Sequence, residues 1–270
     1  MRVGSCPAFV GVETYEFKPI TRTSLNLCYI MYEERFYRGI TKPQDLICYE
    51  VTIKETDLLC CTKVDVKDFI EERVFFYRHQ LEEYIRMRPI FKDSLVPVGD
   101  DVFAPDIVKA MIKSSALVGV GPMATVAGAI AEFVGRDISP LTDEYIIENG
   151  GDIYLKTSTE RVISIYAKDS PFSKKIGIRL KPSSSPYGVC TSSGTVGHSL
   201  SFGHADAVCI VGISSLFTDG LATCLGNIVK KKGDIPFAIE KGKAYQDVLG
   251  ILIILGEHMG LWGNIEIVKV

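Results

Sequence analysis

The sequence predicts an α+β fold in which mixed or antiparallel sheets are flanked by helices. Two observations predict this class. Short runs rich in aromatic and β-branched residues occur towards both ends of the chain, and segments with helical spacing of apolar residues lie between them. Hydrophobic residues make up 47% of the 270 positions and charged residues 23%, which is typical of a globular chain with a sizeable core. We expect a single domain over residues 1–270.

The N-terminal part of the chain, about residues 10–64, is predicted to form a β-meander. Turn residues such as Gly39 and Pro43 separate runs of strand composition. The strands are expected at 14–17, 27–32 and 47–53.

Helices are predicted next. Apolar residues recur at helical spacing from Asp65, a candidate N-cap, to Arg88, and Pro89 ends the pattern. A second helix is expected from Pro105. After a glycine-containing break, residues 123–134 are almost all small, which favours close packing of a helix against another element or a ligand.

The second half of the chain is predicted to contain short strands, a helix over about 218–230 and a C-terminal helix and hairpin over about 236–270. The hairpin is expected to pair 251–255 with 265–270, and 183–186 is expected to be a loop. The apolar run 248–255 is much shorter than the roughly 20 residues that span a bilayer, so it predicts a buried strand or the end of a buried helix. The remaining strands are expected at 145–147, 153–155, 162–166, 176–180 and 208–211.

The charge balance and the cysteines exclude several classes of protein. A net charge of -3 gives no reason to expect nucleic acid, and the lysines at 174–175 and 230–232 are interpreted as solvated turns. The chain shows no secretory leader and no Cys-x-x-Cys pair among its 8 cysteines. We therefore expect free thiols, a cytoplasmic protein, no zinc site and no membrane association.

The segment from Cys190 to Asp206 is the most informative stretch. It holds one thiol, six hydroxyls, three glycines and two of the four histidines, without Lys, Arg or Glu. Glycines and small hydroxyl residues let the backbone approach an anion such as phosphate, although a Ser/Gly turn between strands gives the same composition. His198 and His204 are candidate bases, metal ligands or structural histidines, and Cys190 is a candidate nucleophile or a buried strand residue.

Two glycine turns and one helix add further candidates. Gly150 and Gly151 form a turn flanked by Asn149 and Asp152, which leaves room for a planar group or makes a plain hairpin. The Gly119–Ala124 turn precedes a helix and presents free N–H groups, but it fits neither the Rossmann fingerprint nor a P-loop. Asp219 and Thr223 lie four apart on a predicted helix, where they suit Mg²⁺; the alternative is that Asp219 or Thr218 is an N-cap.

Taken in order, these motifs resemble the ApbE-like superfamily. The resemblance is carried by Gly-Pro-Met-Ala at 121–124, Asn-Gly-Gly-Asp-Ile at 149–153, Thr-Ser-Ser-Gly at 191–194 and Asp-x-x-x-Thr at 219–223, within about 115–230. It implies a T-fold-like domain, with a motif-bearing core of about 105–230, related to Mg²⁺-dependent flavin transferases. Those enzymes take FAD, release AMP and attach FMN to a threonine of a target protein. The residues of these motifs are most similar to those of a short, functionally uncharacterised prokaryotic branch associated with sulfur assimilation and homocysteine formation.

The sequence also departs from the transferase pattern. Thr125 stands where transferases have a lysine, and the segment from His198 to Asp206 lacks their Asp-Pro-x-Thr-Gly. Two hypotheses follow: a protein that binds FAD, FMN or a related diphosphate with Mg²⁺ and acts as a flavin transferase, or a non-catalytic accessory protein of sulfur metabolism. A protein acceptor or a sulfur-metabolism partner belongs to these hypotheses, and a homo-oligomer stays open.

The residue chemistry and the resemblance together give specific candidates. The catalytic candidates are His198, His204 and Cys190, and the metal candidates are Asp219, Thr223 and the carbonyl of Ala124. The cofactor-binding candidates are Gly121, Met123, Ala124, Glu148, Asn149, Gly150, Gly151, Asp152, Thr191, Ser192, Ser193 and Gly194.

Overall fold

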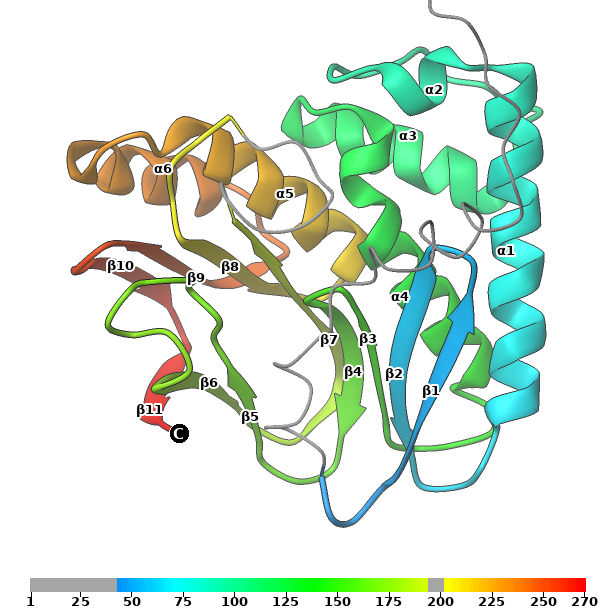
Figure 1. Ribbon diagram of the computed structural model, residues 1–270, viewed down its shortest axis with the longest axis horizontal. Coiled ribbons are helices and arrows are strands. Elements are labelled where there is room, and N and C mark those ends of the chain that lie inside the picture. Colours follow the sequence, from blue (N-terminus) through cyan, green and yellow to red (C-terminus); the bar gives the residue numbers. More distant parts are fainter. Residues whose placement is uncertain (1–42, 194–201) are drawn as a thin grey trace, which may run out of the picture. The chain divides into compact units, whose positions relative to one another are not determined.

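The computed structural model describes residues 43–193 and 202–270. Within them, eight strands form one sheet in the order β1-β2-β3-β4-β7-β8-β9-β10, and three form a second sheet in the order β11-β6-β5 (Figure 1). The paired strands of both sheets are antiparallel, so the predicted fold class is confirmed. The strands are β1 Ile47–Ile53, β2 Thr56–Thr62, β3 Tyr145–Asn149, β4 Asp152–Thr157, β5 Arg161–Ser164, β6 Ile176–Leu180, β7 Ser183–Ser192, β8 Ala207–Gly212, β9 Val248–Leu255, β10 His258–Gly263 and β11 Glu266–Lys269.

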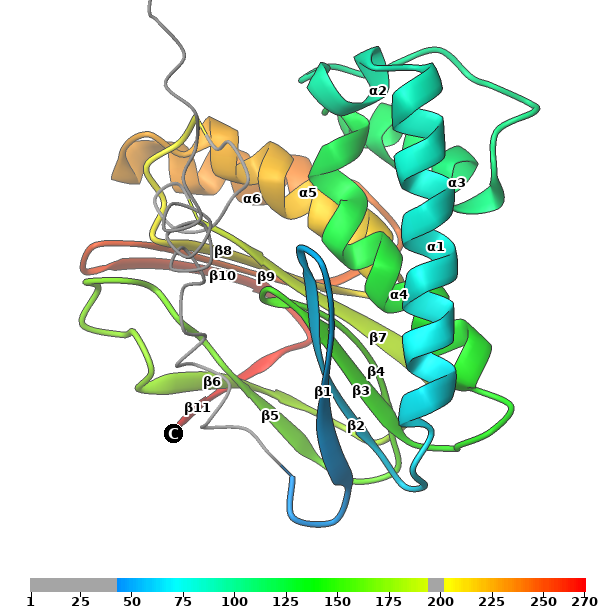
Figure 2. The same ribbon diagram turned by 45° about the vertical axis from the view of Figure 1, so that its right-hand side comes forward.

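The helices and the second sheet cover opposite faces of the main sheet. In Figures 1 and 2 the helices lie above it and the three-stranded sheet lies below. Apolar side chains of β5 and β6 form one core with those of β7, β8 and β9. The helices are α1 Lys67–Met87, α2 Ile90–Asp93, α3 Asp106–Val118, η2 Pro122–Thr125, α4 Val126–Ile138, α5 Ser215–Ile228, η3 Lys232–Asp234 and α6 Ile235–Gly242.

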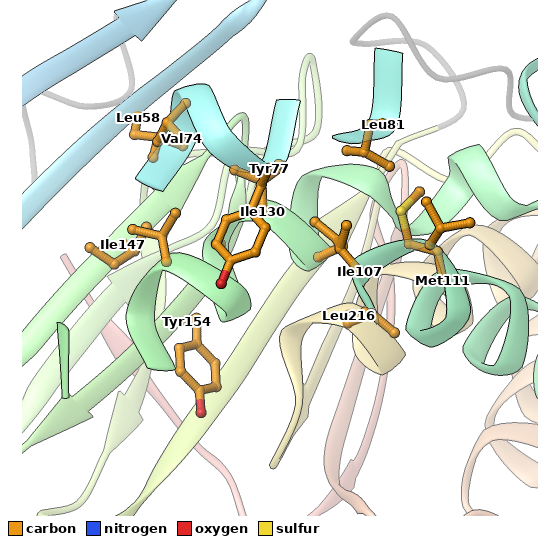
Figure 3. Packing of buried hydrophobic residues seen from close by; sticks show 14 of the residues in the cluster. Leu58, Val74, Tyr77, Leu81, Ile107, Met111, Ile130, Ile147, Tyr154 and Leu216 are labelled. Carbon is orange, nitrogen blue, oxygen red and sulfur yellow. The ribbon is translucent and has the colours of Figure 1, made fainter. Parts of the chain in front are cut away.

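Helix α1 follows the predicted apolar spacing closely. Its buried residues recur three or four positions apart, and they face α3, α4 and the sheet (Figure 3). Each such side chain contributes roughly 1.5–3 kcal/mol when fully buried. Val66, not Asp65, is the N-cap, although an Asp65 carboxylate oxygen accepts a hydrogen bond from Lys67 N at 3.0 Å. The buried residues are Ile70, Val74, Tyr77, Leu81 and Tyr84.

Two glycines bring α4, α5 and β7 into backbone contact. A Cβ atom on Gly128 would lie 2.2 Å from the Ser215 carbonyl oxygen, and one on Gly188 would lie 2.3 Å from the Ser214 carbonyl carbon. Both distances are too short for any side chain, so only glycine permits this approach. The small-residue helix predicted over 123–134 is thus used for close packing; it divides into η2 and α4.

Two predictions about the second half of the chain are wrong. Strand β9 pairs with β10 across a tight turn at Gly256, whose φ is 57°, and residues 266–269 pair instead with β6. The segment 183–186 is not a loop but the start of β7. Its Ser/Pro composition is tolerated because β7 meets β4 there at a register shift between Leu155 and Thr157, where regular ladder bonding is interrupted. The expected strands at 14–17 and 27–32 lie outside the described residues.

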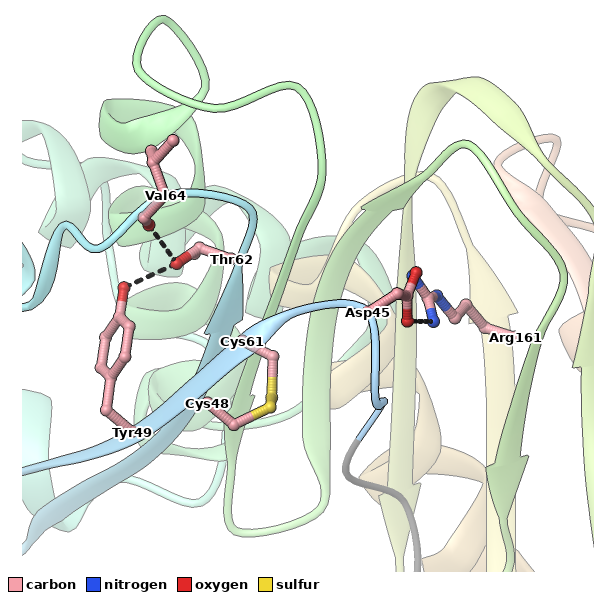
Figure 4. Close-up of a disulfide and its surroundings, with 7 residues drawn as sticks. All are labelled: Asp45, Cys48, Tyr49, Cys61, Thr62, Val64 and Arg161. Carbon is pink, nitrogen blue, oxygen red and sulfur yellow. Dashed lines mark hydrogen bonds and ion pairs between the residues drawn. A yellow bond between two sulfur atoms is a disulfide. The ribbon is translucent and has the colours of Figure 1, made fainter.

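The expectation that all cysteines are free thiols is also wrong. Cys48 on β1 and Cys61 on β2 face each other in the strand register and form a disulfide (Figure 4). Their separation of 13 residues carries no motif that a sequence pattern could have flagged. Within the described part of the chain, Cys60, Cys190, Cys209 and Cys224 are free and buried.

Over the described ranges, no single helix has the length and apolar composition to cross a membrane. Helix α3 together with η2 and α4 reaches those limits only as a pair, and the pair is bent by 100°.

Candidate functional site

Two groups of the predicted cofactor-binding residues, at 148–152 and 191–192, lie at one end of the main sheet, where β4 pairs with β7. Gly150 and Gly151 form the two-residue turn between β3 and β4, with φ of 68° and 104°. A carboxylate oxygen of Glu148 accepts a hydrogen bond from Gly151 N at 2.8 Å, which fixes the turn. The positive φ angles explain the two glycines, so the plain-hairpin interpretation accounts for the turn itself.

The same end of the sheet receives the N-terminus of α4. Asn149 donates a hydrogen bond from Nδ2 to the Ala127 carbonyl at 3.2 Å. Met123, Ala124 and Ala127 are only half-buried, so this turn is reachable from solvent. Gly121 is required for packing, since a Cβ atom there would lie 1.8 Å from the Ser94 carbonyl oxygen.

Asp219 lies inside α5 and is not an N-cap. Ser214 caps the helix through its side chain, which accepts from Phe217 N, and Thr218 donates its hydroxyl to the Ser214 carbonyl. The N-cap interpretation of Asp219 and Thr218 is therefore wrong. Instead, one carboxylate oxygen of Asp219 accepts from Gly128 N at 2.9 Å, at the N-terminal end of α4. Thr223, one turn further along α5, is buried with it.

Asp152 and Asp219 form a pair of buried acids. Each exposes only 9% of its surface. Burial raises the pKa of Asp219 to about 7, although hydrogen bonds from the backbone of Gly128 and Ala127 lower it. Burial and the Asp219 charge raise the pKa of Asp152 well above its usual value. Within the described residues, none of the principal interactions of these two carboxyls involves Lys, Arg or His.

Strand β7 brings the hydroxyl-rich segment to this pair. Cys190 lies opposite Asp152 in the β4–β7 register, and Ser192 follows on the same face of the strand. The Ser192 hydroxyl is buried and makes no hydrogen bond with residues 43–193 or 202–270. Such an unpaired buried donor is costly, about 1–3 kcal/mol, and commonly marks a missing ligand or ion. Thr191 and Ser193 are half-buried beside it.

Cys190 fits the buried-cysteine alternative. It is 0% exposed and donates from Sγ to the Ser215 carbonyl at 3.2 Å. Burial raises the pKa of the Cys190 thiol well above its usual value, and the Asp152 and Asp219 charges raise it further. An activated nucleophile requires the opposite shift, so we do not carry this role forward.

His204 does not approach the acid pair. It lies at the far end of α5, where its backbone N donates to the Val229 carbonyl at 2.7 Å and Nδ1 contacts the Lys230 carbonyl at 3.1 Å. Asp219 and Val229 are ten positions apart, which corresponds to about 15 Å along a helix. His198 and Gly194 lie outside the described residues.

The sequence reasoning missed Glu132. This residue of α4 is 2% exposed, and one of its carboxylate oxygens accepts from Ser214 Oγ at 2.6 Å and from Leu216 N at 3.0 Å. Its other oxygen accepts from Arg136. Glu132 thus caps the N-terminus of α5 from a second helix and fixes the helix that carries Asp219 and Thr223. Its place within an apolar, small-residue helix was the available signal.

Comparison with known proteins agrees with this fold and these motifs. A family model described as AbpE bacteria matches residues 39–247, which is more than half of the chain. The chain belongs to this family. The UPF0280 protein of Methanocaldococcus jannaschii is 40% identical over 228 residues, covering 81% of this chain and 92% of the relative. The UPF0280 protein of Methanosarcina acetivorans is 39% identical over 197 residues, covering 72% and 78%.

Solved structures support the fold of this family member. The flavinyl transferase ApbE of Pseudomonas stutzeri, in its apo form, superposes with a TM-score of 0.53 over 80% of this chain and 93% of that chain, at 14% identity. The ApbE protein of Thermotoga maritima gives 0.51 over 80% and 96%, at 13% identity. Identities this low show a shared fold. The chain is thus an ApbE-like protein of the UPF0280 branch, and it shares its fold with the flavinyl transferase ApbE of Pseudomonas stutzeri.

Proposed function

We propose that this protein binds a nucleotide diphosphate, in the first instance a flavin nucleotide, together with Mg²⁺ where η2, α4, α5 and β7 meet. The observation that carries the proposal is the buried pair Asp152 and Asp219, whose pKa values are raised and whose principal interactions involve no basic side chain of the described residues. A bound cation would stabilise the ionised pair, and a diphosphate would bring oxygens to the cation.

The residues present fit such a metal. Asp219 supplies a carboxylate, Thr223 a hydroxyl and Ala124 a backbone carbonyl, which are the hard oxygen ligands that Mg²⁺ prefers. Among the described residues, no group of three or more His, Cys, Asp or Glu could hold a metal by itself. The ion would therefore depend on phosphate oxygens and water for its remaining ligands. When bound, Mg²⁺ neutralises the phosphate charge.

The protein groups around the pair would position the ligand. The hydroxyl of Ser192 has no hydrogen-bond partner among the described residues and follows Cys190 on the face of β7 that meets Asp152, and Thr191 and Ser193 flank it. The half-buried turn at Met123 and Ala124 offers backbone contacts from the opposite side. Gly150 and Gly151 leave the end of the sheet free of side chains there.

Two observations favour binding without flavin transfer as the second candidate function. Thr125, at the position of the transferase lysine, is fully buried and donates its hydroxyl to the Pro122 carbonyl at 2.8 Å, so it supplies no charge. His204, a candidate base, lies about 15 Å along α5 from the acid pair. A protein acceptor, the association with sulfur assimilation and homocysteine formation, and a cytoplasmic location remain predictions that rest on the sequence.

Calorimetric titration with FAD, with and without Mg²⁺, tests the proposal. Asp219→Asn should weaken Mg²⁺-dependent binding at least about tenfold, or 1.4 kcal/mol. The matched control is Asp57→Asn. Asp57 is also a buried acid, and burial and the Glu148 charge raise its pKa to about 6. The next residue, Leu58, faces the helices, so the Asp57 side chain points to the other side of the sheet. Equal loss in both variants, or none in either, would remove Asp219 from the site.

Release of AMP from FAD separates the two candidate functions. A transferase acting on a threonine-bearing acceptor peptide releases AMP in step with peptide modification, and Asp219→Asn abolishes it. A binding protein retains FAD and releases AMP no faster than the solution without protein.

A further inference from the structure

Strand β10 is an outer strand of the main sheet, and no described strand pairs with the side that faces away from β9 (Figure 1). Outer strands present unpaired N–H and C=O groups, and proteins commonly block such edges with charged residues, prolines or bulges. The other outer strands of the two sheets carry charge, with Glu50 on β1, Arg161 on β5 and Glu266 on β11. From His258 to Gly263, β10 has no Lys, Arg, Asp, Glu or Pro. Its edge is therefore open to pairing with another strand.

The turn between β9 and β10 determines which backbone groups of β10 point outward. Leu255 and His258 are paired across a two-residue turn. In a hairpin of this kind, these two residues exchange both backbone hydrogen bonds. Since the direction of the N–H and C=O groups alternates along a strand, His258 and Gly260 bond to β9. The N–H and C=O groups of Met259 and Leu261 point outward.

The side chains of β10 divide between the two faces of the sheet. A Cβ atom on Gly260 would lie 2.3 Å from Cγ2 of Ile235 on α6, so this residue faces the helices. Its neighbours Met259 and Leu261 therefore point to the opposite face, where they are 38% and 46% exposed. The outward backbone groups and the exposed apolar side chains thus belong to the same two residues.

A second copy of β10 matches this pattern in an antiparallel register. A two-fold axis beside Gly260 sets Met259 of each copy opposite Leu261 of the other. Opposite residues of antiparallel strands point to the same face, so both apolar pairs lie on one face of the joined sheet. Each pair also exchanges backbone hydrogen bonds, and the two Gly260 residues take the closer, non-hydrogen-bonded position. Glu257 lies opposite Gly263 of the second copy, so no like charges face each other there.

We propose that β10 pairs antiparallel with β10 of a second copy, which joins the two main sheets into one continuous sheet across a homodimer. The occupant is another molecule of this protein because Met259 and Leu261 complement each other under the two-fold operation, in backbone direction and in side-chain character. The interface consists of a single strand from each chain. It is therefore small, and we expect a weak, concentration-dependent dimer.

Sedimentation equilibrium of the full chain tests the proposal over about 1–100 µM, the range in which a weak dimer dissociates. Leu261→Lys places a charge on the open edge and should raise the dissociation constant at least about tenfold. The control Ile47→Lys makes the same change on β1, the other outer strand of the sheet, at a residue that is 49% exposed, and should leave the dissociation constant unchanged. A wild-type protein that is monomeric throughout this range, or equal loss in both variants, would overturn the proposal.

Paired charges test the register. Met259→Lys combined with Leu261→Asp in one chain sets a lysine opposite an aspartate at both pairs when the axis lies beside Gly260. The double variant should therefore dimerise more tightly than either single variant. An axis beside Leu261 would instead set the two Leu261→Asp substitutions against each other. Weaker association of the double variant than of both single variants, with folding confirmed by circular dichroism, would exclude the proposed register.

Amide exchange of the unmodified protein, at concentrations above and below the dissociation constant, measures the pairing directly. The N–H groups of Met259 and Leu261 should exchange more slowly in the dimer than in the monomer. Those of Gly260 and Trp262, which bond to β9, should exchange slowly at both concentrations. Slow exchange of Met259 and Leu261 in the monomer as well would show that a segment of the same chain covers the edge, and the dimer proposal would be wrong.

Discussion

Glu144 and Asp219 are both buried carboxyls, yet the protein surrounds them in opposite ways. Glu144 exposes 1% of its surface and accepts hydrogen bonds from Thr157 at 2.8 Å, Ser158 at 2.7 Å and Arg161 at 2.7 Å. Lys63 adds an ion pair at 3.2 Å. Burial alone would raise the pKa of Glu144, but these groups outweigh it and lower the pKa to about 2.

Asp219 receives backbone N–H groups but no cation from the described residues, and its pKa rises to about 7. The comparison shows which buried carboxyl receives cationic partners from the described part of the chain and which does not. Around Glu144 the chain supplies hydroxyl, guanidinium and ammonium partners, whereas the described residues supply Asp219 with backbone N–H groups and no cation. The second arrangement is typical of a site that an external cation completes.

The largest loss of stability is expected when Glu144 is removed, because the chain itself supplies the partners of this carboxyl. Glu144→Ala leaves Arg161 with Asp45 as its one acidic partner among the described residues and removes the acceptor of the buried Thr157 hydroxyl and of the Ser158 hydroxyl, so unfolding free energy should fall by about 3–5 kcal/mol. Urea unfolding measures this. The control Glu266→Gln breaks an exposed pair with Arg179 and should cost less than about 1 kcal/mol. A loss of unfolding free energy in Glu144→Ala no larger than in Glu266→Gln would mean that the partners of Glu144 do not stabilise it, and the contrast with Asp219 would fail.

The second prediction concerns the disulfide beside this network. Arg161 holds Asp45 with two hydrogen bonds, and the Cys48–Cys61 bond ties the following β1 strand to β2 (Figure 4). Closing a loop of this length stabilises a fold by about 3 kcal/mol in the chain-entropy model. Reduction should lower the urea midpoint accordingly and raise the thiol count of denatured protein by two. An unchanged thiol count would show that the two cysteines are free after all.

The third prediction acts on the support of Asp219. Gly128→Ala places a Cβ atom 2.2 Å from the Ser215 carbonyl oxygen and 2.8 Å from Asp219 Cβ. Helices α4 and α5 must separate, which should cost about 1–3 kcal/mol and weaken Mg²⁺-dependent nucleotide binding. Gly233→Ala meets no atom within 4 Å and is the control in both measurements. Binding at the wild-type level in Gly128→Ala would show that Asp219 does not depend on this contact.

The sequence predicted more of the fold than of the site. Strong periodic segments such as α1, the β3–β4 turn and α5 were found because local spacing determines them. The pairing of β9 with β10, the strand at Ser183 and the Cys48–Cys61 bond were missed. The strand at Ser183 depends on pairing with β4, which the local sequence does not show. The other two lie in hairpins of consecutive strands, and they were missed because the short turns that join those strands were not recognised.

The candidate site divides in the same way. The motif order groups Asp152, Ser192 and Asp219 as candidates for one site, and this grouping stays a prediction, although β4 and β7 do set Asp152 opposite Cys190, two positions before Ser192. It did not include Glu132, whose acidic side chain in an apolar helix was the available signal but whose role as a cap for α5 arises only when two helices pack. His204 was assigned to the site only because it is close in sequence to the hydroxyl-rich segment. In the fold it lies at the C-terminal end of α5, away from Asp219.

The smallest expected effect is the change of unfolding free energy with each pH unit. Rising pH lowers the contribution of Asp219 and raises that of Glu144. The folded-state pKa of Asp219 is raised from 3.8 to about 7, so its contribution is complete below about pH 4 and is lost as pH rises through 7. The pKa of Glu144 is lowered from 4.5 to about 2, so its contribution is present above pH 4.5 and is lost as pH falls through 2.

Asp219→Asn should therefore flatten the decline in unfolding free energy between pH 4 and 7, by at most about 1.4 kcal/mol per pH unit. Urea midpoints at closely spaced pH values measure it, and Glu144→Gln is the control because it should alter only the acid limb. Saturating Mg²⁺ with FAD should flatten the wild-type profile in the same interval, since a cation at the acid pair stabilises the ionised form that proton loss creates. A wild-type profile that is already flat between pH 4 and 7 would mean that the Asp219 carboxyl is as well satisfied as Glu144, and the reason to expect a cation beside it would be gone.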